Sequence, residues 1–146
     1  SLKLVGVLDE SGMEPVQNRI EKLPFMDWRQ LPAVIAGLDI NLMPLENSLF
    51  HWCKSENKWT EAALVKVPSV MSRNCEMEYV VENGKDGWMC TTKEEWVNAL
   101  EALVTDEKAR KAMGEAAHQK VMEHYLTVNT GKDAMEELLC SESYTK

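Results

Sequence analysis

Four polar residues at short spacing could bind a ligand that carries both phosphates and hydroxyls. They are Lys54, Ser55, Lys58 and Glu61. The two lysines could neutralise phosphate charge, and the Glu61 carboxylate could accept hydrogen bonds from hydroxyl groups. Lys58 is three positions from both Ser55 and Glu61, so these three side chains share one face if the segment is helical.

The segments around these residues read as a strand, a loop, a helix and a second strand. The apolar runs 39–45 and 68–72 are typical of buried parallel strands. Between them we expect a loop from Glu46 to Lys54 and a helix that Ser55 caps and that runs to about Val65. In an open α/β sheet, ligands bind where a strand leads into a helix N-terminus, because free N–H groups and the helix dipole favour anions there. Glu46 opens this loop and is a further candidate for contact with the ligand.

Each candidate also has a purely structural interpretation, and the residues alone leave both open. Glu61 could be an ordinary exposed helix glutamate that pairs with Lys58 or Lys54. Lys54 could be a solvated loop lysine, and Ser55 could do no more than cap the helix. His51 and Trp52 are interpreted as packing or rim residues.

The rest of the chain alternates between short apolar strands and amphipathic helices. Further strands are predicted at residues 2–8, 19–25 and 88–91. Helix starts are predicted at Asp27 and Asn74, and Thr92 with Glu95 forms a capping box. A longer helix is expected over 106–125 and a last one over 131–140. This order predicts an α/β fold, a Rossmann-like three-layer domain with a mostly parallel sheet, formed as a single domain by residues 1–146.

Composition excludes several function classes. The 146 residues carry a net charge of −8, which argues against binding to nucleic acid, since that needs a basic face. No apolar run approaches the roughly 20 residues that span a bilayer. The four cysteines form no C-x-x-C pair, so we expect small buried thiols in a reduced, cytoplasmic protein rather than a disulfide framework or a zinc site. The chain starts at Ser1, inside a predicted strand, and we expect a fragment of a longer protein.

Three segments, in order, resemble a known family. They are LPAVIAGLDINLMPL (31–45), FHWCKSENKWTEAALVKVPSVMS (50–72) and EMEYVVENGKDGWMCTTKEEWVNALEALVTDEKARKAMGEAA (76–117). Together they resemble the C-terminal, donor-binding half of GT-B-fold glycosyltransferases of family 1 or family 4. Two positions depart from the family pattern: Cys53 stands where many members carry the first glutamate of E-x7-E, and Lys66 replaces a glycine.

The resemblance implies a function for the chain as half of an enzyme. It implies transfer of a hexosyl-type sugar, with retention, from a nucleoside diphosphate sugar to a glycan, glycoconjugate or lipid-linked glycan acceptor. Glu61 would contact the ribose, while Lys54, Ser55, Lys58 and Glu46 would contact the rest of the donor. The resemblance names no catalytic residue and implies no cofactor and no essential metal.

The resemblance also implies a cellular setting and leaves two alternative functions to consider. The setting is bacterial polysaccharide assembly in the cytoplasm, with peripheral association of the full-length protein at the inner membrane. The fragment is expected to be inactive without its N-terminal domain. One alternative is a non-catalytic nucleotide-sugar-binding module with the same fold, which the missing first glutamate favours. A receiver-type signalling domain is disfavoured, because Asp39 opens its strand instead of following it.

Overall fold

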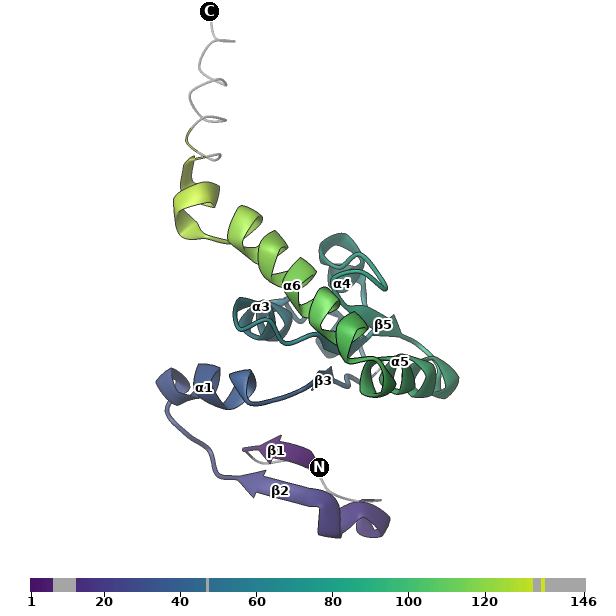
Figure 1. Ribbon diagram of the computed structural model, residues 1–146. Helices are drawn as coiled ribbons and strands as arrows, with labels where there is room; N and C mark the ends of the chain where they lie inside the picture. The colour runs from purple at the N-terminus through teal and green to yellow at the C-terminus, as the bar shows by residue number, and fades with distance from the viewer. Residues whose placement is uncertain (7–12, 47, 133–134, 136–146) are drawn as a thin grey trace, which may run out of the picture. The chain divides into compact units, whose positions relative to one another are not determined.

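The computed structural model describes residues 1–6, 13–46, 48–132 and 135. The chain divides into two compact units, Ser1–Val34 and Ile35–Lys146, which are described separately below (Figure 1). The single domain expected over residues 1–146 stays a prediction. The turn at 9–12 and most of the helix expected over 131–140 lie outside the described residues, and residues 127–132 are helical.

The first unit is built on two parallel strands, as the sequence predicts. Strand β1 (Leu2–Val5) pairs with β2 (Ile20–Leu23), and the 3-10 helix η1 (Glu14–Arg19) leads into β2. A second 3-10 helix, η2 (Trp28–Gln30), precedes α1 (Leu31–Ala36), whose last residues belong to the second unit. The predicted cap is confirmed, because the Asp27 carboxylate accepts a hydrogen bond from the Arg29 backbone N–H at 2.9 Å.

The second unit holds a three-stranded parallel sheet in the order β3–β4–β5. Its strands are β3 (Asn41–Met43), β4 (Ser69–Ser72) and β5 (Trp88–Cys90), and all three pairings are parallel. The strands expected at 39–45, 68–72 and 88–91 are therefore confirmed. The central strand β4 is almost fully buried, which explains its continuous apolar sequence.

Helices cover both faces of this sheet. They are α3 (Asn57–Leu64), α4 (Cys75–Val80), α5 (Lys93–Thr105) and α6 (Glu107–His124). Successive residues of a strand face opposite sides: Met71 of β4 packs in a cluster with Trp59 of α3 and Met77 of α4, whereas Val70 packs with Leu103 of α5. Helix α6 contacts both α3 and α5 (Figure 1). This arrangement confirms the predicted three-layer α/β fold.

Local capping chemistry sets several helix starts. The Asn74 side chain accepts a hydrogen bond from the Met77 N–H at 2.8 Å, and Thr92 with Glu95 forms the predicted capping box at the start of α5. The backbone N–H groups of Thr91 and Thr92 donate to Glu95 and lower the pKa of its carboxyl group. These interactions satisfy N–H groups that have no partner inside the helix.

Three local expectations are wrong. Helix α3 begins at Asn57 with Glu56 as its N-cap and without a side-chain cap, so Ser55 is not the cap. The expected loop 46–54 contains a short helix, α2 (Leu49–Trp52), which Ser48 caps. The cysteines are not all buried: Cys90 is, but Cys53 and Cys75 are exposed free thiols.

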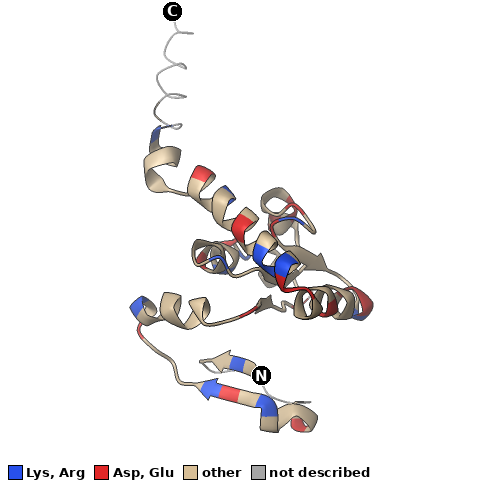
Figure 2. Cartoon of the chain, viewed as in Figure 1, with Lys and Arg blue, Asp and Glu red and all other residues tan. Residues whose placement is uncertain are grey.

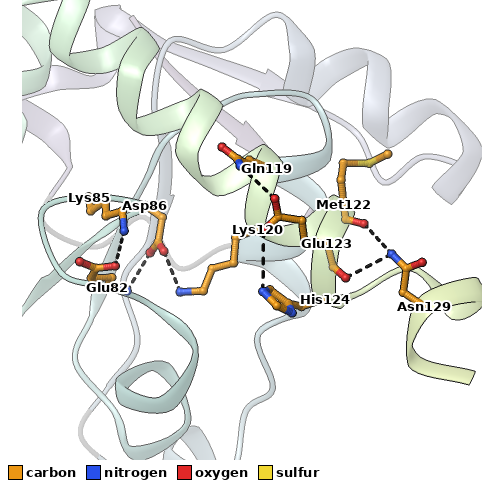
Figure 3. Close-up of polar contacts among 9 residues, drawn as sticks. All are labelled: Glu82, Lys85, Asp86, Gln119, Lys120, Met122, Glu123, His124 and Asn129. Atoms are coloured by element: carbon orange, nitrogen blue, oxygen red, sulfur yellow. Dashed lines mark hydrogen bonds and ion pairs between the residues drawn. The ribbon is translucent and has the colours of Figure 1, made fainter. Parts of the chain in front are cut away.

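A partly buried ion pair connects α6 to the turn that precedes β5 (Figure 3). The Lys120 Nζ lies 2.7 Å from the Asp86 Oδ2, and the Asp86 side chain is 4% exposed. The Asp86 Oδ1 accepts a hydrogen bond from the Glu82 N–H at 2.8 Å. The Asp86 carbonyl accepts another at 2.9 Å from the indole N–H of Trp59, so the turn is also tied to α3.

Lys66 has a left-handed backbone conformation, which favours glycine. Its φ is +62°, a region that costs a residue with a Cβ roughly 1–2 kcal/mol. Its ammonium group forms an ion pair with Glu115 at 2.8 Å, and both side chains are more than half exposed. Such a pair contributes little.

Replacing Lys66 with glycine should therefore stabilise the protein. We expect Lys66→Gly to raise the free energy of unfolding by about 0.5–1 kcal/mol, because relief of the backbone strain exceeds the loss of the exposed pair. Urea denaturation measures this change. Lys111→Gly is the control, since Lys111 lies inside α6 and glycine there should cost about 1 kcal/mol. A loss of stability in both variants would contradict the prediction.

Candidate functional site

A cavity of about 520 Å³ in the second unit lies at the carboxyl ends of all three strands of its sheet. Its lining combines residues 44–46 after β3, 72–75 at and after the end of β4, and 90 and 91 at the end of β5. Residues 51 and 52 of α2, 78 of α4 and 96 of α5 complete the wall. Ligands of open α/β sheets bind at this edge, and the volume is within the usual range for ligand pockets.

Hydrogen bonds between neighbouring strand ends hold the cavity in shape. The Ser72 hydroxyl accepts from the Leu45 N–H at 2.8 Å and donates to the Leu45 carbonyl at 3.1 Å. The Arg73 N–H donates to the Cys90 carbonyl at 3.0 Å. The ends of β3 and β4 are thus connected through the Ser72 hydroxyl, and those of β4 and β5 through backbone groups, which makes the cavity a preformed feature of the fold.

The short helix α2 forms one side of the cavity. Its cap, Ser48, accepts from the His51 N–H, and the Ser48 hydroxyl also lies 2.8 Å from the His51 Nδ1. His51 and Trp52 line the cavity, which agrees with their interpretation as rim residues. Leu49 and Phe50 are 76% and 68% exposed. A helix whose apolar residues face solvent has no amphipathic pattern, so no such pattern marks this helix in the sequence.

The charged groups of the cavity are Glu46, Arg73 and Glu78. Arg73 Nη1 donates to the Glu78 Oε1 at 3.1 Å, whereas the Glu46 carboxylate has no hydrogen-bond or ion-pair partner among the described residues. Burial, with a smaller effect of the negative charge on Glu95, raises the pKa of the Cys90 thiol. Cys90 is therefore a neutral part of the wall and not an activated nucleophile.

The predicted candidates fall into two groups. Glu46 lines the cavity, whereas Lys54, Ser55, Lys58 and Glu61 are outside the described lining. The Lys54 ammonium lies over the Phe50 ring, 4.3 Å from its centroid. Lys58 and Glu61 are exposed on α3, and within the described part of the chain neither side chain has a hydrogen-bond or ion-pair partner. The pairing of Lys58 with Glu61 is thus not formed.

The sequence analysis missed Arg73 and Asn74. Both directly follow β4, so the rule that pointed to Glu46 after β3 could have found them as well.

The positive and negative charges elsewhere are interleaved: Lys111 pairs with Glu107 at 2.6 Å on α6, and both signs occur along that helix (Figure 2). In the described ranges no three His, Cys, Asp or Glu residues are grouped so as to hold a metal ion, and no helix is long and apolar enough to cross a membrane.

Comparison with known proteins identifies the fold and the family. The parallel α/β architecture is that of one half of a GT-B glycosyltransferase. The family model described as glycosyl transferases group 1 matches residues 1–106, and the chain belongs to this family. No curated protein matches the chain.

Solved structures with the same fold include three glycosyltransferases. HepE of Anabaena, crystallised with UDP-glucose, is 18% identical with a TM-score of 0.70, over 86% of this chain and 34% of HepE. Sucrose-phosphate synthase of Thermosynechococcus elongatus is 14% identical with a TM-score of 0.70, over 97% of this chain and 39% of the synthase. The C-terminal domain of LpcC, a glycosyl transferase group 1 family protein of Francisella tularensis, is 18% identical with a TM-score of 0.58, over 76% of this chain and 56% of that structure. The chain thus spans about a third of the length of HepE.

Proposed function

We propose that this chain is the donor-binding half of an enzyme that transfers a hexosyl group from a nucleoside diphosphate sugar, with retention, to a glycan or glycoconjugate acceptor. The observation that carries the proposal is the preformed cavity at the carboxyl ends of β3, β4 and β5 in a chain of the glycosyl transferase group 1 family. The UDP-glucose bound by HepE, which has the same fold, supports a nucleotide sugar as the ligand.

The exposed polar groups near the start of α3 suit the nucleotide. No side chain caps the first turn of α3, so its backbone N–H groups can receive a phosphate. Lys54, Ser55 and Lys58 are exposed there, and the lysines would stabilise charge that develops on the leaving diphosphate. Glu61, which has no partner in the described ranges, would accept hydrogen bonds from the ribose hydroxyls.

The proposal also covers the remaining half of the enzyme and its cellular setting. An N-terminal half would hold the acceptor, so this chain alone should bind the donor without transferring sugar. The proposed setting is bacterial polysaccharide assembly in the cytoplasm, with peripheral attachment of the full-length enzyme to the inner membrane. Diphosphate charge would be met by lysines and backbone N–H groups, and no essential metal or cofactor is part of the proposal.

Removal of the Glu61 carboxylate should weaken nucleotide binding. Titration calorimetry with UDP, GDP and ADP should show saturable binding of one nucleotide, and we expect Glu61→Ala to weaken it about tenfold, the effect of losing one or two hydrogen bonds to a charged group. Glu101→Ala is the matched control, because Glu101 is also an exposed helix glutamate, on α5. Equal affinities in the two variants, or absence of nucleotide binding by the wild type, would count against the proposal.

A further inference from the structure

The cysteines in the described part of the chain differ in exposure and in place. Cys90 is buried in the cavity wall, where burial raises the pKa of its thiol and makes it unreactive. Cys53 and Cys75 are exposed free thiols. Cys75 lines the cavity at the strand ends, whereas Cys53 follows α2 outside the described lining. A group attached to the Cys75 sulfur would therefore take up space in the cavity, which is not expected of a group on Cys53.

The residue before Cys75 has a buried donor that lacks a partner. The Asn74 side chain is anchored, because its Oδ1 caps α4 by accepting from the Met77 N–H at 2.8 Å. Asn74 is 6% exposed and lines the cavity, and its Nδ2 has no hydrogen-bond partner among the described residues. Buried polar groups without a partner are rare in folded proteins. An oxygen atom of a ligand held beside Cys75 would supply the missing acceptor.

The cavity also presents charges of both signs. The Glu46 carboxylate lines it and has no hydrogen-bond or ion-pair partner in the described ranges. Arg73 Nη1 donates to Glu78 at 3.1 Å, and a guanidinium has further N–H donors. An α-amino acid group complements this set, because its ammonium can donate to Glu46 and its carboxylate can accept from Arg73 and Asn74. Small aminothiols such as glutathione carry this group and a thiol in one molecule.

We propose that Cys75 is a redox modification site, at which a small aminothiol of the glutathione type forms a mixed disulfide that fills the cavity. The Cys75 thiolate attacks one sulfur of the oxidised aminothiol. The new S–S bond forms as the old one breaks, and the other half leaves as a thiolate, which takes up the proton that Cys75 lost. An excess of the reduced aminothiol reverses the exchange. The consequence, loss of donor binding under oxidising conditions, rests on the proposed function.

The first measurement is the equilibrium of thiol–disulfide exchange at each exposed thiol. The 146-residue chain, with Cys140→Ser, is equilibrated with mixtures of reduced and oxidised glutathione, and mass spectrometry locates the mixed disulfides. We expect the mixed disulfide at Cys75 to be about tenfold more stable than that at Cys53, the effect of one or two hydrogen bonds to charged groups. Asn74→Asp keeps the oxygen that caps α4 and removes the donor, so it should remove most of this preference. Asn98→Asp, at an exposed position of α5, is its matched control and should retain the preference.

Hydroxyethyl disulfide is the matched probe, because the group that it transfers lacks the ammonium and the carboxylate. Its mixed disulfides at Cys53 and Cys75 should be equally stable. The same preference for Cys75 with this neutral probe would show that exposure alone decides, and it would overturn the inference. Equal stability of the two glutathione adducts, or a full preference retained in Asn74→Asp, would overturn it as well.

The filling of the cavity is measured by NMR on the indole N–H of Trp96, which lines the cavity and packs against the cluster that contains Val70 and Leu103. The signal is assigned with Trp96→Phe. Glutathione attached to Cys75 in a Cys53→Ser protein should shift it, and glutathione attached to Cys53 in a Cys75→Ser protein should not. An unshifted Trp96 signal in the first protein would overturn the inference.

The effect on donor binding is measured by calorimetry with UDP-glucose, GDP-glucose and ADP-glucose. The Cys53→Ser protein with glutathione on Cys75 should bind its donor about tenfold or more weakly than the same protein after reduction, because the adduct fills the cavity. An unchanged donor affinity would overturn the inference. Failure of the proposed function is read separately, as absence of binding of all three donors by the reduced protein, and the exchange equilibrium and the Trp96 signal then still decide whether Cys75 is a modification site.

Discussion

Replacing Asp86 with alanine is expected to lower the free energy of unfolding by about 3–5 kcal/mol, the usual cost of removing one partner of a buried ion pair. The substitution leaves the Lys120 ammonium, whose side chain is only 29% exposed, without its partner at 2.7 Å. It also removes the acceptor of the Glu82 N–H (Figure 3). The loss includes both a poorly solvated charge and an unsatisfied backbone donor, so it should exceed the effect of any surface charge.

Three further variants separate the contribution of the ion pair to stability from that of its surroundings. Lys120→Met alone should also destabilise the protein, because Asp86 is then a buried charge without a partner. The double variant Asp86→Asn with Lys120→Met should recover much of the loss, since no buried charge remains and the asparagine oxygen can still accept from Glu82. Glu107→Ala is the control: its pair with Lys111 is exposed on both sides and should contribute less than about 1 kcal/mol. Urea denaturation measures all four, and an Asp86→Ala effect no larger than that of the control would contradict the prediction.

The features predicted correctly from the sequence are those whose cause is local. The capping box of Thr92 and Glu95 and the cap at Asn74 involve residues three positions apart, and such contacts can be read from spacing. The apolar runs that form β3, β4 and β5 could be recognised from their composition alone, because a continuous apolar sequence is typical of a strand that is buried on both faces. The alternation of these runs with amphipathic segments then predicts the parallel α/β architecture.

The local errors have physical reasons as well. Ser55 has the right residue type for a cap, but α3 begins two residues later, and Glu56 takes the cap position. Helix α2 was predicted as part of a loop because Leu49 and Phe50 face solvent, so no polar face alternates with a buried one. Helix α2 is short and is held by the Ser48 cap and by its position beside the cavity. Its sequence therefore has no periodic pattern of apolar residues to detect.

Each strand end that contributes to the candidate site could be predicted by itself, but the way in which the strand ends lie together could not. Glu46 follows β3 directly, and the sequence analysis selected it. Arg73 and Asn74 become neighbours of Glu46 only through the register of β3 with β4, which no spacing in the chain encodes. The pairing of Asp86 with Lys120, which are 34 positions apart, depends in the same way on how α6 crosses the sheet.

Gly114 permits the close approach of α6 to the segment that leads into β4. A Cβ at position 114 would overlap the Lys66 carbonyl oxygen and lie 2.8 Å from the Lys66 carbonyl carbon. Those atoms cannot easily move away. The neighbouring backbone is held by hydrogen bonds from Lys66 N–H to the Ala63 carbonyl and from Val67 N–H to the Ala62 carbonyl, both at 3.0 Å. The clash must therefore be relieved by displacing α6 itself.

We expect Gly114→Ala to lower the free energy of unfolding by about 3 kcal/mol, at the upper end of the usual cost of overpacking, even though alanine favours helix formation. Gly131→Ala is the matched control: a Cβ there meets nothing within 4 Å, so in the helical segment 127–132 alanine should stabilise by up to about 1 kcal/mol. Adding Lys66→Gly to Gly114→Ala should leave most of the loss in place, because the clash involves the carbonyl group and not the lysine side chain. Urea denaturation of the three variants decides the point, and a Gly114→Ala protein as stable as the wild type would show that α6 does not cross residues 65–67 this closely.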